Sequence, residues 1–272
     1  DAAAPGTVFR NQGNDVRLQA RHVPLGPLTG VVGVQAESAS FSADGEEAFA
    51  PYSRTRQRAV FLHEELATSW GRLSLGARRE SVTVASQGNP LVARFDAGER
   101  RFAPTAWALG ALWRLSPAWG LTANLAHSER APRDYELFAN GPHVATAAWE
   151  VGNAALGLER SANVDVGFQW RQGPNSARVS AFDNRFSNYI ALQATGSVRT
   201  TPDGDDLPST PIAACAPASP ASRRRASRAC GSAPAPGTSS GAATRCAPAT
   251  RTPASRCPAS PPCAPAPPWP GA

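Results

Sequence analysis

Apolar and polar residues alternate along most of the first 192 residues, and this period of two limits the fold more than any other feature. Between 163 and 170, the even positions hold valine, phenylalanine and tryptophan, whereas the odd positions hold polar residues or glycine. The stretch 107–115 has tryptophan, leucine and alanine at its odd positions. Successive side chains of a strand point to opposite faces, so each segment has one apolar and one polar face. The pattern predicts an all-β fold.

Eight alternating segments are expected to form strands of one antiparallel sheet. Each spans at least 9 residues, which is longer than the usual soluble strand of about 5–6 residues. A strand of about 9–11 residues is long enough to cross a bilayer at a tilt. The segments lie near 15–23, 30–40, 57–68, 71–85, 103–116, 119–130, 161–172 and 176–191.

The connections between these segments alternate in length. Short turns at one end of the strands and long loops at the other are typical of an outer-membrane barrel. We therefore expect the long loops to face the outside of the cell and the short turns to face the periplasm. Short turns fall at 23–27, 67–70, 116–118 and 172–175, and long loops fall at 41–56, 86–102 and 131–160.

A soluble β-sandwich or β-propeller is the alternative, but its strands are shorter and its loops show no such alternation of length. The polar face is rich in arginine, asparagine, glutamine, serine and glycine, which suits a wet lumen rather than a packed core. Four tryptophans stand near segment ends, as in an aromatic girdle. These are Trp70, Trp119, Trp149 and Trp170. The pattern favours a partial antiparallel transmembrane β-barrel of about eight strands.

The formal net charge of +6 comes from the end of the chain. Residues 209–272 contain seven arginines and no acidic residue, whereas residues 1–208 hold 20 basic and 21 acidic side chains. This distribution disfavours a globally basic nucleic-acid-binding protein, so no nucleic-acid partner is expected. No stretch of about 18 apolar residues predicts a transmembrane helix. The first residues lack the basic and apolar regions of a signal peptide, so none is expected.

Residues 209–272 form a tail of different composition. They hold all five cysteines and 14 of the 26 prolines, and the alternation stops where they begin. Such a composition buries little apolar surface, so a disordered Ala/Pro/Arg/Cys-rich tail is expected. A secreted linker and a disulfide module are alternatives, although five cysteines is an odd number for the second. The interpretation we favour over both is that the tail is out of frame and carries no evolved function, because a one-base shift permits acidic residues, a Gly-Glu-Pro-Leu-Pro turn and an alternating strand.

Several motifs follow one another between residues 124 and 190. Asn124-Leu-Ala-His-Ser-Glu-Arg-Ala-Pro132 precedes Tyr135-Glu-Leu-Phe-Ala-Asn-Gly-Pro-His143, and Leu156-Gly-Leu-Glu-Arg-Ser161 follows. The matching return strand reads Phe182-Asp-Asn-Arg-Phe-Ser-Asn-Tyr-Ile190, with aspartate at its second position in place of the common tyrosine. Together the motifs resemble the C-terminal barrel of TonB-dependent outer-membrane receptors. The Phe-Ala-Asn-Gly-Pro-His form resembles the branch associated with zinc or haem uptake.

The resemblance implies an energised transporter in the outer membrane of a Gram-negative bacterium. Such a receptor is a barrel of about 22 strands with an N-terminal plug domain inside it. Its partners are the outer-membrane lipid and a small ligand of the iron, zinc, haem or siderophore type. An inner-membrane TonB complex acts through the plug region, which we do not expect in this chain. Residues 1–208 correspond to part of the barrel wall, and no cofactor is expected.

His143 is the main candidate for ligand contact, because it stands in the longest expected loop and a neutral imidazole is a ready metal or haem ligand. Glu136 and Asn140, in the same loop, are the other candidate ligand-binding residues. The alternative for His143 is an ordinary loop histidine. His127 is expected to form a structural pair near Glu129 at the barrel rim.

His63 is followed by Glu64 and Glu65, which is not the helical His-Glu-x-x-His zinc motif. Strand alternation places His63 and Glu65 on one face and Glu64 on the other. The sequence contains no catalytic triad, phosphate-binding glycine loop or Cys-x-x-Cys pair, so an enzyme is not expected. Two function classes remain, a TonB-dependent receptor fragment and the wall of a passive porin-like or adhesin-type barrel. The motifs favour the first.

Overall fold

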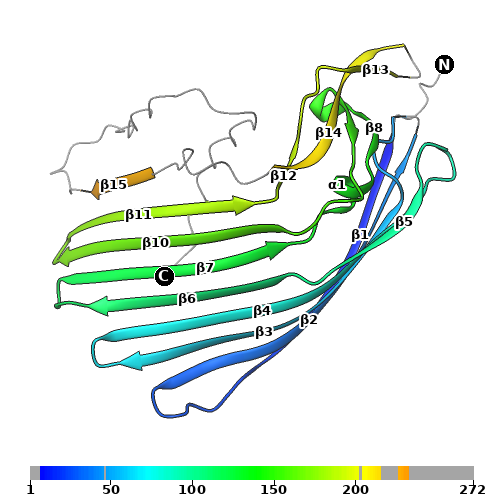
Figure 1. Cartoon of the computed structure of the whole chain (residues 1–272). Helices are drawn as coiled ribbons and strands as arrows, with labels where there is room; N and C mark the ends of the chain where they lie inside the picture. Colours follow the sequence, from blue (N-terminus) through cyan, green and yellow to red (C-terminus); the bar gives the residue numbers. More distant parts are fainter. Residues whose placement is uncertain (1–6, 46, 202–203, 216–225, 233–272) are drawn as a thin grey trace. The chain divides into compact units, whose positions relative to one another are not determined.

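The computed structural model describes residues 7–45, 47–201 and 204–215, and the backbone of 226–232 (Figure 1). All of them belong to one compact unit, residues 1–240. Ten strands form the main sheet, in the order β1-β2-β3-β4-β6-β7-β10-β11-β15 with β5 paired to β4. They are β1 (Val8–Arg21), β2 (Leu28–Asp44), β3 (Ser53–Thr68), β4 (Gly71–Gln87), β5 (Ala97–Phe102), β6 (Thr105–Arg114), β7 (Trp119–Arg130), β10 (Glu159–Gln172), β11 (Asn175–Ser187) and β15 (Ala226–Ser232).

All eight predicted strands are present, and all neighbours in the main sheet pair antiparallel. The strands are longer than predicted where they enter the loops: β2 reaches Asp44 and β3 begins at Ser53, so the first long loop shortens to 45–52. Within the described residues, the first strand of the sheet, β1, pairs on one side alone. The sheet is therefore open, which confirms the prediction of a partial barrel.

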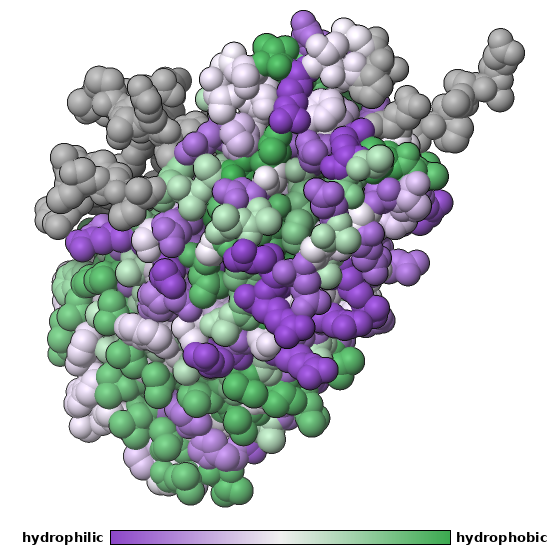
Figure 2. All heavy atoms as spheres, turned by 45° about the vertical axis from the view of Figure 1, so that its right-hand side comes forward, coloured by the Kyte–Doolittle hydropathy of each residue, from purple (hydrophilic) through white to green (hydrophobic). Residues whose placement is uncertain are grey.

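The main sheet has an apolar face and a polar face, as the alternation predicts. Leu75, Leu109, Leu125 and Val164 stand in register on β4, β6, β7 and β10, and each is more than one third exposed. On the opposite face, Asn124 donates a hydrogen bond of 2.8 Å to Asp165. In the view of Figure 2, apolar side chains gather in the lower part and polar side chains above them. A broad exposed apolar surface of this kind requires lipid or a partner to cover it.

A second, smaller sheet is made by the connections after β7 and β11. Its strand order is β12-β14-β9-β8, with β13 paired to β14, and β9 and β14 run parallel. A small core joins it to the main sheet, because Val82 and Val84 of β4 pack with Leu137, Leu156 and Ile190. The elements are α1 (Asp134–Phe138), β8 (Asn140–His143), η1 (Val144–Thr146), β9 (Ala148–Val151), β12 (Tyr189–Leu192), β13 (Val198–Thr200) and β14 (Asp206–Cys215).

Three of the four predicted girdle tryptophans lie at the turn end of the main sheet. Trp70 stacks on Trp113 with ring centroids 5.7 Å apart, and Trp119 lies 6.1 Å from Trp170. The fourth prediction is wrong, because Trp149 lies on β9 among the loops and is 8% exposed. Its apolar ring is buried by loop packing rather than placed at a membrane interface.

The predicted boundary at residue 208 falls inside β14, which runs from Asp206 to Cys215. Residues 209–215 and 226–232, expected to be disordered, therefore form strands: β14 pairs with β9 and β12, and β15 pairs with β11. This corrects the start of the tail. Local composition misplaced it because β14 is fixed by partners distant in the sequence. The prediction for 216–225 and 233–272 concerns residues outside the described ones.

Candidate functional site

The long connections meet at one end of the main sheet, opposite the short hairpin turns (Figure 1). Three segments contribute, 45–52, 88–96 and 131–158, and we call their assembly the loop cluster. The Asn140 N–H donates to the Phe49 carbonyl at 2.9 Å, and the Tyr52 N–H donates to the Gly88 carbonyl at 2.9 Å. These backbone bonds hold together segments that lie far apart in the sequence.

His143 is held in one orientation by two neighbours in the loop cluster. Its Nδ1 lies 2.8 Å from Oε1 of Glu150, and its ring stacks on Phe49 with centroids 4.1 Å apart. The Glu150 side chain is 3% exposed. Because a carboxylate only accepts hydrogen bonds, the neutral imidazole carries its proton on Nδ1 and has its lone pair on Nε2. The His143 side chain is 29% exposed, so the ring is reachable from solvent.

Asn140 and Arg94 connect two of the loops. The Arg94 Nε donates to the Asn140 carbonyl at 2.7 Å, and its Nη2 donates to the Ala48 carbonyl at 2.5 Å. The Asn140 Nδ2 donates to the Arg94 carbonyl, and its Oδ1 accepts from the Trp149 indole, both at 3.2 Å. Burial lowers the pKa of the Arg94 guanidinium from its ordinary value, but arginine stays charged at neutral pH. Both side-chain amide atoms of Asn140 thus contact protein groups.

Glu136 is committed to an ion pair. Its two carboxylate oxygens accept from the Arg130 guanidinium at 2.8 and 3.1 Å, and Oε2 also accepts from the Arg133 N–H at 2.7 Å. Arg130 contacts Glu159 as well, at 3.2 Å. Two-pronged contacts of this kind are strong and fix geometry. The network attaches α1 to the main sheet. Burial raises the pKa of the adjacent Tyr135 phenol.

The structure therefore brings two of the three candidate residues together. Asn140 and His143 both stand on β8, whereas Glu136 lies on α1 and contacts Arg130. Phe49 and Glu150, which orient His143, were not among the residues predicted from the sequence. Glu150 carried a weak signal, as an acidic residue in a mostly apolar run. Phe49 carried none, because its loop is far away in the sequence.

The other histidines have structural partners. His127 lies 3.9 Å from Glu129, as predicted for a rim pair. His63 lies 3.6 Å from Glu65 on the polar face, whereas Glu64 lies on the apolar face 2.9 Å from His22. These contacts confirm the predicted alternation.

No group of three or more metal-ligating side chains stands together in the part of the chain that the structure describes. The loop cluster offers one imidazole, so a metal there would need its other ligands from elsewhere. Among the same residues, no helix has the length and hydropathy to cross a membrane.

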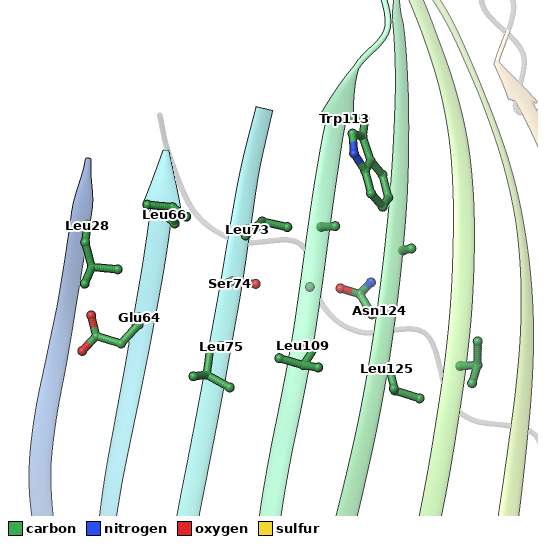
Figure 3. Close-up of a pocket in the computed structure, with 14 residues that line it drawn as sticks. Leu28, Glu64, Leu66, Leu73, Ser74, Leu75, Leu109, Trp113, Asn124 and Leu125 are labelled. Carbon is green, nitrogen blue, oxygen red and sulfur yellow. The ribbon is translucent and has the colours of Figure 1, made fainter. Parts of the chain in front are cut away.

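A surface hollow of about 780 Å³ lies on the apolar face (Figure 3). Leucines of β2, β3, β4, β6 and β7 surround it, together with Trp113. Glu64 adds one carboxylate near its edge, which already contacts His22. An open apolar hollow with so few polar groups does not suit a polar ligand.

Residues 5–227 match the family model described as TonB dependent receptor-like, beta-barrel. The chain therefore belongs to the TonB-dependent receptor-like β-barrel family. Members of this family are transporters of the outer membrane of Gram-negative bacteria. The family match also extends past residue 208, in agreement with β14.

Solved structures share the fold. The hemophore receptor HasR of Serratia marcescens, in complex with HasA and heme, superposes with a TM-score of 0.60 at 18% identity, covering 76% of this chain and 37% of HasR. The copper transporter OprC gives 0.59 at 18% identity, with 76% and 33% covered. The FrpB iron transporter of Neisseria meningitidis gives 0.52 at 12% identity, with 76% and 31% covered. The chain spans about a third of the length of these proteins.

Proposed function

We propose that the chain is part of the barrel wall of an energised outer-membrane receptor, and that its loop cluster helps to bind haem or another metal chelate from outside. The apolar face contacts the membrane lipid, and the long loops face the medium. The TonB complex acts on such a receptor through a plug region that lies outside these residues. The observation that carries the proposal is the arrangement around His143.

His143 has the support that metal-ligating histidines commonly have. One ring nitrogen is held by a carboxylate, which fixes the tautomer and raises the basicity of the other nitrogen. Here the buried Glu150 holds Nδ1 at 2.8 Å, and Nε2 has no hydrogen-bond partner among the described residues. The stacked Phe49 ring adds an apolar wall.

The number of donors favours a metal that arrives with most of its ligands. A bare zinc ion takes four ligands, three or four of them from protein, and the loop cluster offers one imidazole. Haem or a metal chelate needs a single axial or additional ligand. HasR binds heme, and OprC and FrpB transport copper and iron. The similarity of these proteins to this chain supports the fold alone. The proposed class of ligand therefore rests on the residues of the loop cluster.

Absorption spectroscopy of haemin added to the purified chain in detergent tests the proposal. We expect a red-shifted Soret band for the unaltered chain and its loss in His143→Ala. His127→Ala is the matched control, since His127 is also paired with a glutamate, and it should keep the band. Loss of the band in both variants, or in neither, would overturn the assignment to His143.

A further inference from the structure

Three arginines follow one another on the apolar face of β3. Arg54, Arg56 and Arg58 are exposed and lie on the face of Val60 and Leu62, because side chains two apart in a strand point the same way. The three lie on the loop side of the valine and the leucine. At about 3.3 Å per residue, the row covers about 13 Å of the strand.

Arg79 extends this row onto the next strand. It pairs with Val60 in the register of β3 and β4, so it stands beside Arg58 on the same face. None of the four arginines has an ion pair or side-chain hydrogen bond in the described part of the chain. Arginines elsewhere near this end do have acidic partners, as in Arg101 with Glu99. Four unpaired positive charges repel one another, and an anion bound among them would relieve this repulsion. The four arginines are therefore suited to bind an anion.

We call these four arginines the arginine patch. An apolar groove of about 630 Å³ adjoins the patch and reaches two of its four arginines. Val16, Leu18, Val34 and Val60 line it from three neighbouring strands, and each is at least half exposed. Arg58 and Arg79 also line the groove. Apolar wall and guanidinium groups thus form one continuous surface.

We propose that this surface binds a phosphorylated, acylated lipid of the outer leaflet, with an acyl chain in the groove and phosphate on the arginine patch. The patch stands on the loop side of the apolar band, where the headgroups of the outer leaflet lie if the loops face outside. Guanidinium groups bind phosphate through two parallel hydrogen bonds. The acyl chain covers valine and leucine side chains that would otherwise face water.

Apart from Ala103, which lies between β5 and β6, the residues of the site stand on β1 to β4. These strands pair continuously, so binding does not require a closed barrel. The inference rests on the proposed function for the outward orientation of the loops, but it is independent of haem binding by the loop cluster. Failure of haemin binding would leave the lipid site unaffected, and the reverse also holds.

Native mass spectrometry of the full 272-residue chain in detergent micelles tests the proposal. The probes are bis-phosphorylated hexa-acylated lipid A and the same lipid without its phosphates. We expect the unaltered chain to bind the phosphorylated lipid about tenfold more tightly, because charge-assisted bonds add to the apolar contact. This comparison of two lipids needs no variant to fold.

Variants then locate the site. The triple variant Arg56→Gln, Arg58→Gln, Arg79→Gln should lose the preference for phosphate. The control triple Arg17→Gln, Arg171→Gln, Arg178→Gln removes the same charge from the polar face and should keep it. Equal binding of both lipids by the unaltered chain would overturn the proposal. So would absence of lipid binding, or equal loss of the phosphate preference in the two triple variants.

Discussion

The two ends of the main sheet are built by different means. At the turn end, β1–β2, β3–β4, β6–β7 and β10–β11 are joined by two to six residues, so each strand finds its partner locally. At the loop end, contacts join segments far apart in sequence, as between Phe49 and His143. The wall is thus specified by local pattern, whereas the loop cluster depends on tertiary contacts. Loops can therefore change with the ligand while the wall stays the same.

The largest expected loss of stability at the loop end, compared with the turn end, comes from Arg130→Gln. This change leaves the carboxylates of Glu136 and Glu159, which are 10% and 14% exposed, without their cation. Breaking such a pair costs about 3 kcal/mol of unfolding free energy. Urea unfolding followed by tryptophan fluorescence measures the loss. Arg72→Gln is the turn-end control, because its pair with Glu65 is exposed and costs less than about 1 kcal/mol. Equal losses would remove the distinction between the two ends.

Glycine-to-alanine substitutions at the two ends should show the same contrast with a smaller loss of stability. A Cβ on Gly152 would lie 2.6 Å from the backbone nitrogens of Phe138 and Ala139, which cannot move aside as a flexible side chain can. Gly152→Ala should therefore cost about 1–3 kcal/mol and separate β9 from α1. Gly173, in a hairpin turn, has a φ of +57° and open space around it, so Gly173→Ala should cost about 1 kcal/mol from backbone strain alone.

Limited proteolysis distinguishes the two glycine variants by where they are cut. Gly152→Ala should become sensitive within the 131–158 loop while the hairpins stay protected. Gly173→Ala should keep that loop protected. Cutting within 131–158 in both variants would show that the ends are coupled.

The smallest expected effect is the pH dependence at the turn end. Hydrogen bonds to the Val23 carbonyl and the Glu64 carboxylate raise the pKa of His22 above 6.5. Because the pKa is higher in the folded state, protonated His22 stabilises the fold fully below about pH 6.5. This stabilisation is lost as the pH rises through the raised pKa. The stability difference between the unaltered chain and His22→Gln should thus shrink from pH 5.5 to pH 9. The same difference measured in a Glu64→Gln background should depend less on pH, and an unchanged dependence would contradict the contact.

The sequence was sufficient to predict the wall because the period of two and the turn lengths are local properties. Each of the eight strands and the split of His63 and Glu64 between faces followed from alternation alone. Trp149 was misplaced because its position near a segment end is also compatible with burial among loops. The small sheet was missed for a physical reason: β9 and β14 pair in parallel across about 60 residues, which no local pattern reports.

The candidate site could be predicted in part. His143 was found by residue type and loop position, but its orienting partners Glu150 and Phe49 needed the folded loops. Glu136 was predicted as a ligand-binding residue because of its charge, but its carboxylate forms an ion pair with Arg130. The out-of-frame interpretation of the tail stays a prediction. Resequencing should reveal one extra base near the Pro208 codon and an extended alternating frame, and an early stop in that frame would refute it.

Quenching of single tryptophans by brominated lipid tests the central claim, that the apolar face lies in lipid and the loop cluster in water. Trp107 is 39% exposed on the apolar face, whereas Trp149 lies in the loop cluster. Two variants of the full chain would each keep one of these tryptophans, with the others changed to phenylalanine, in vesicles of brominated phospholipid. We predict strong quenching of Trp107 and little quenching of Trp149. Equal quenching of the two, or stronger quenching of Trp149, would contradict the assignment of the chain to a membrane-embedded wall with external loops.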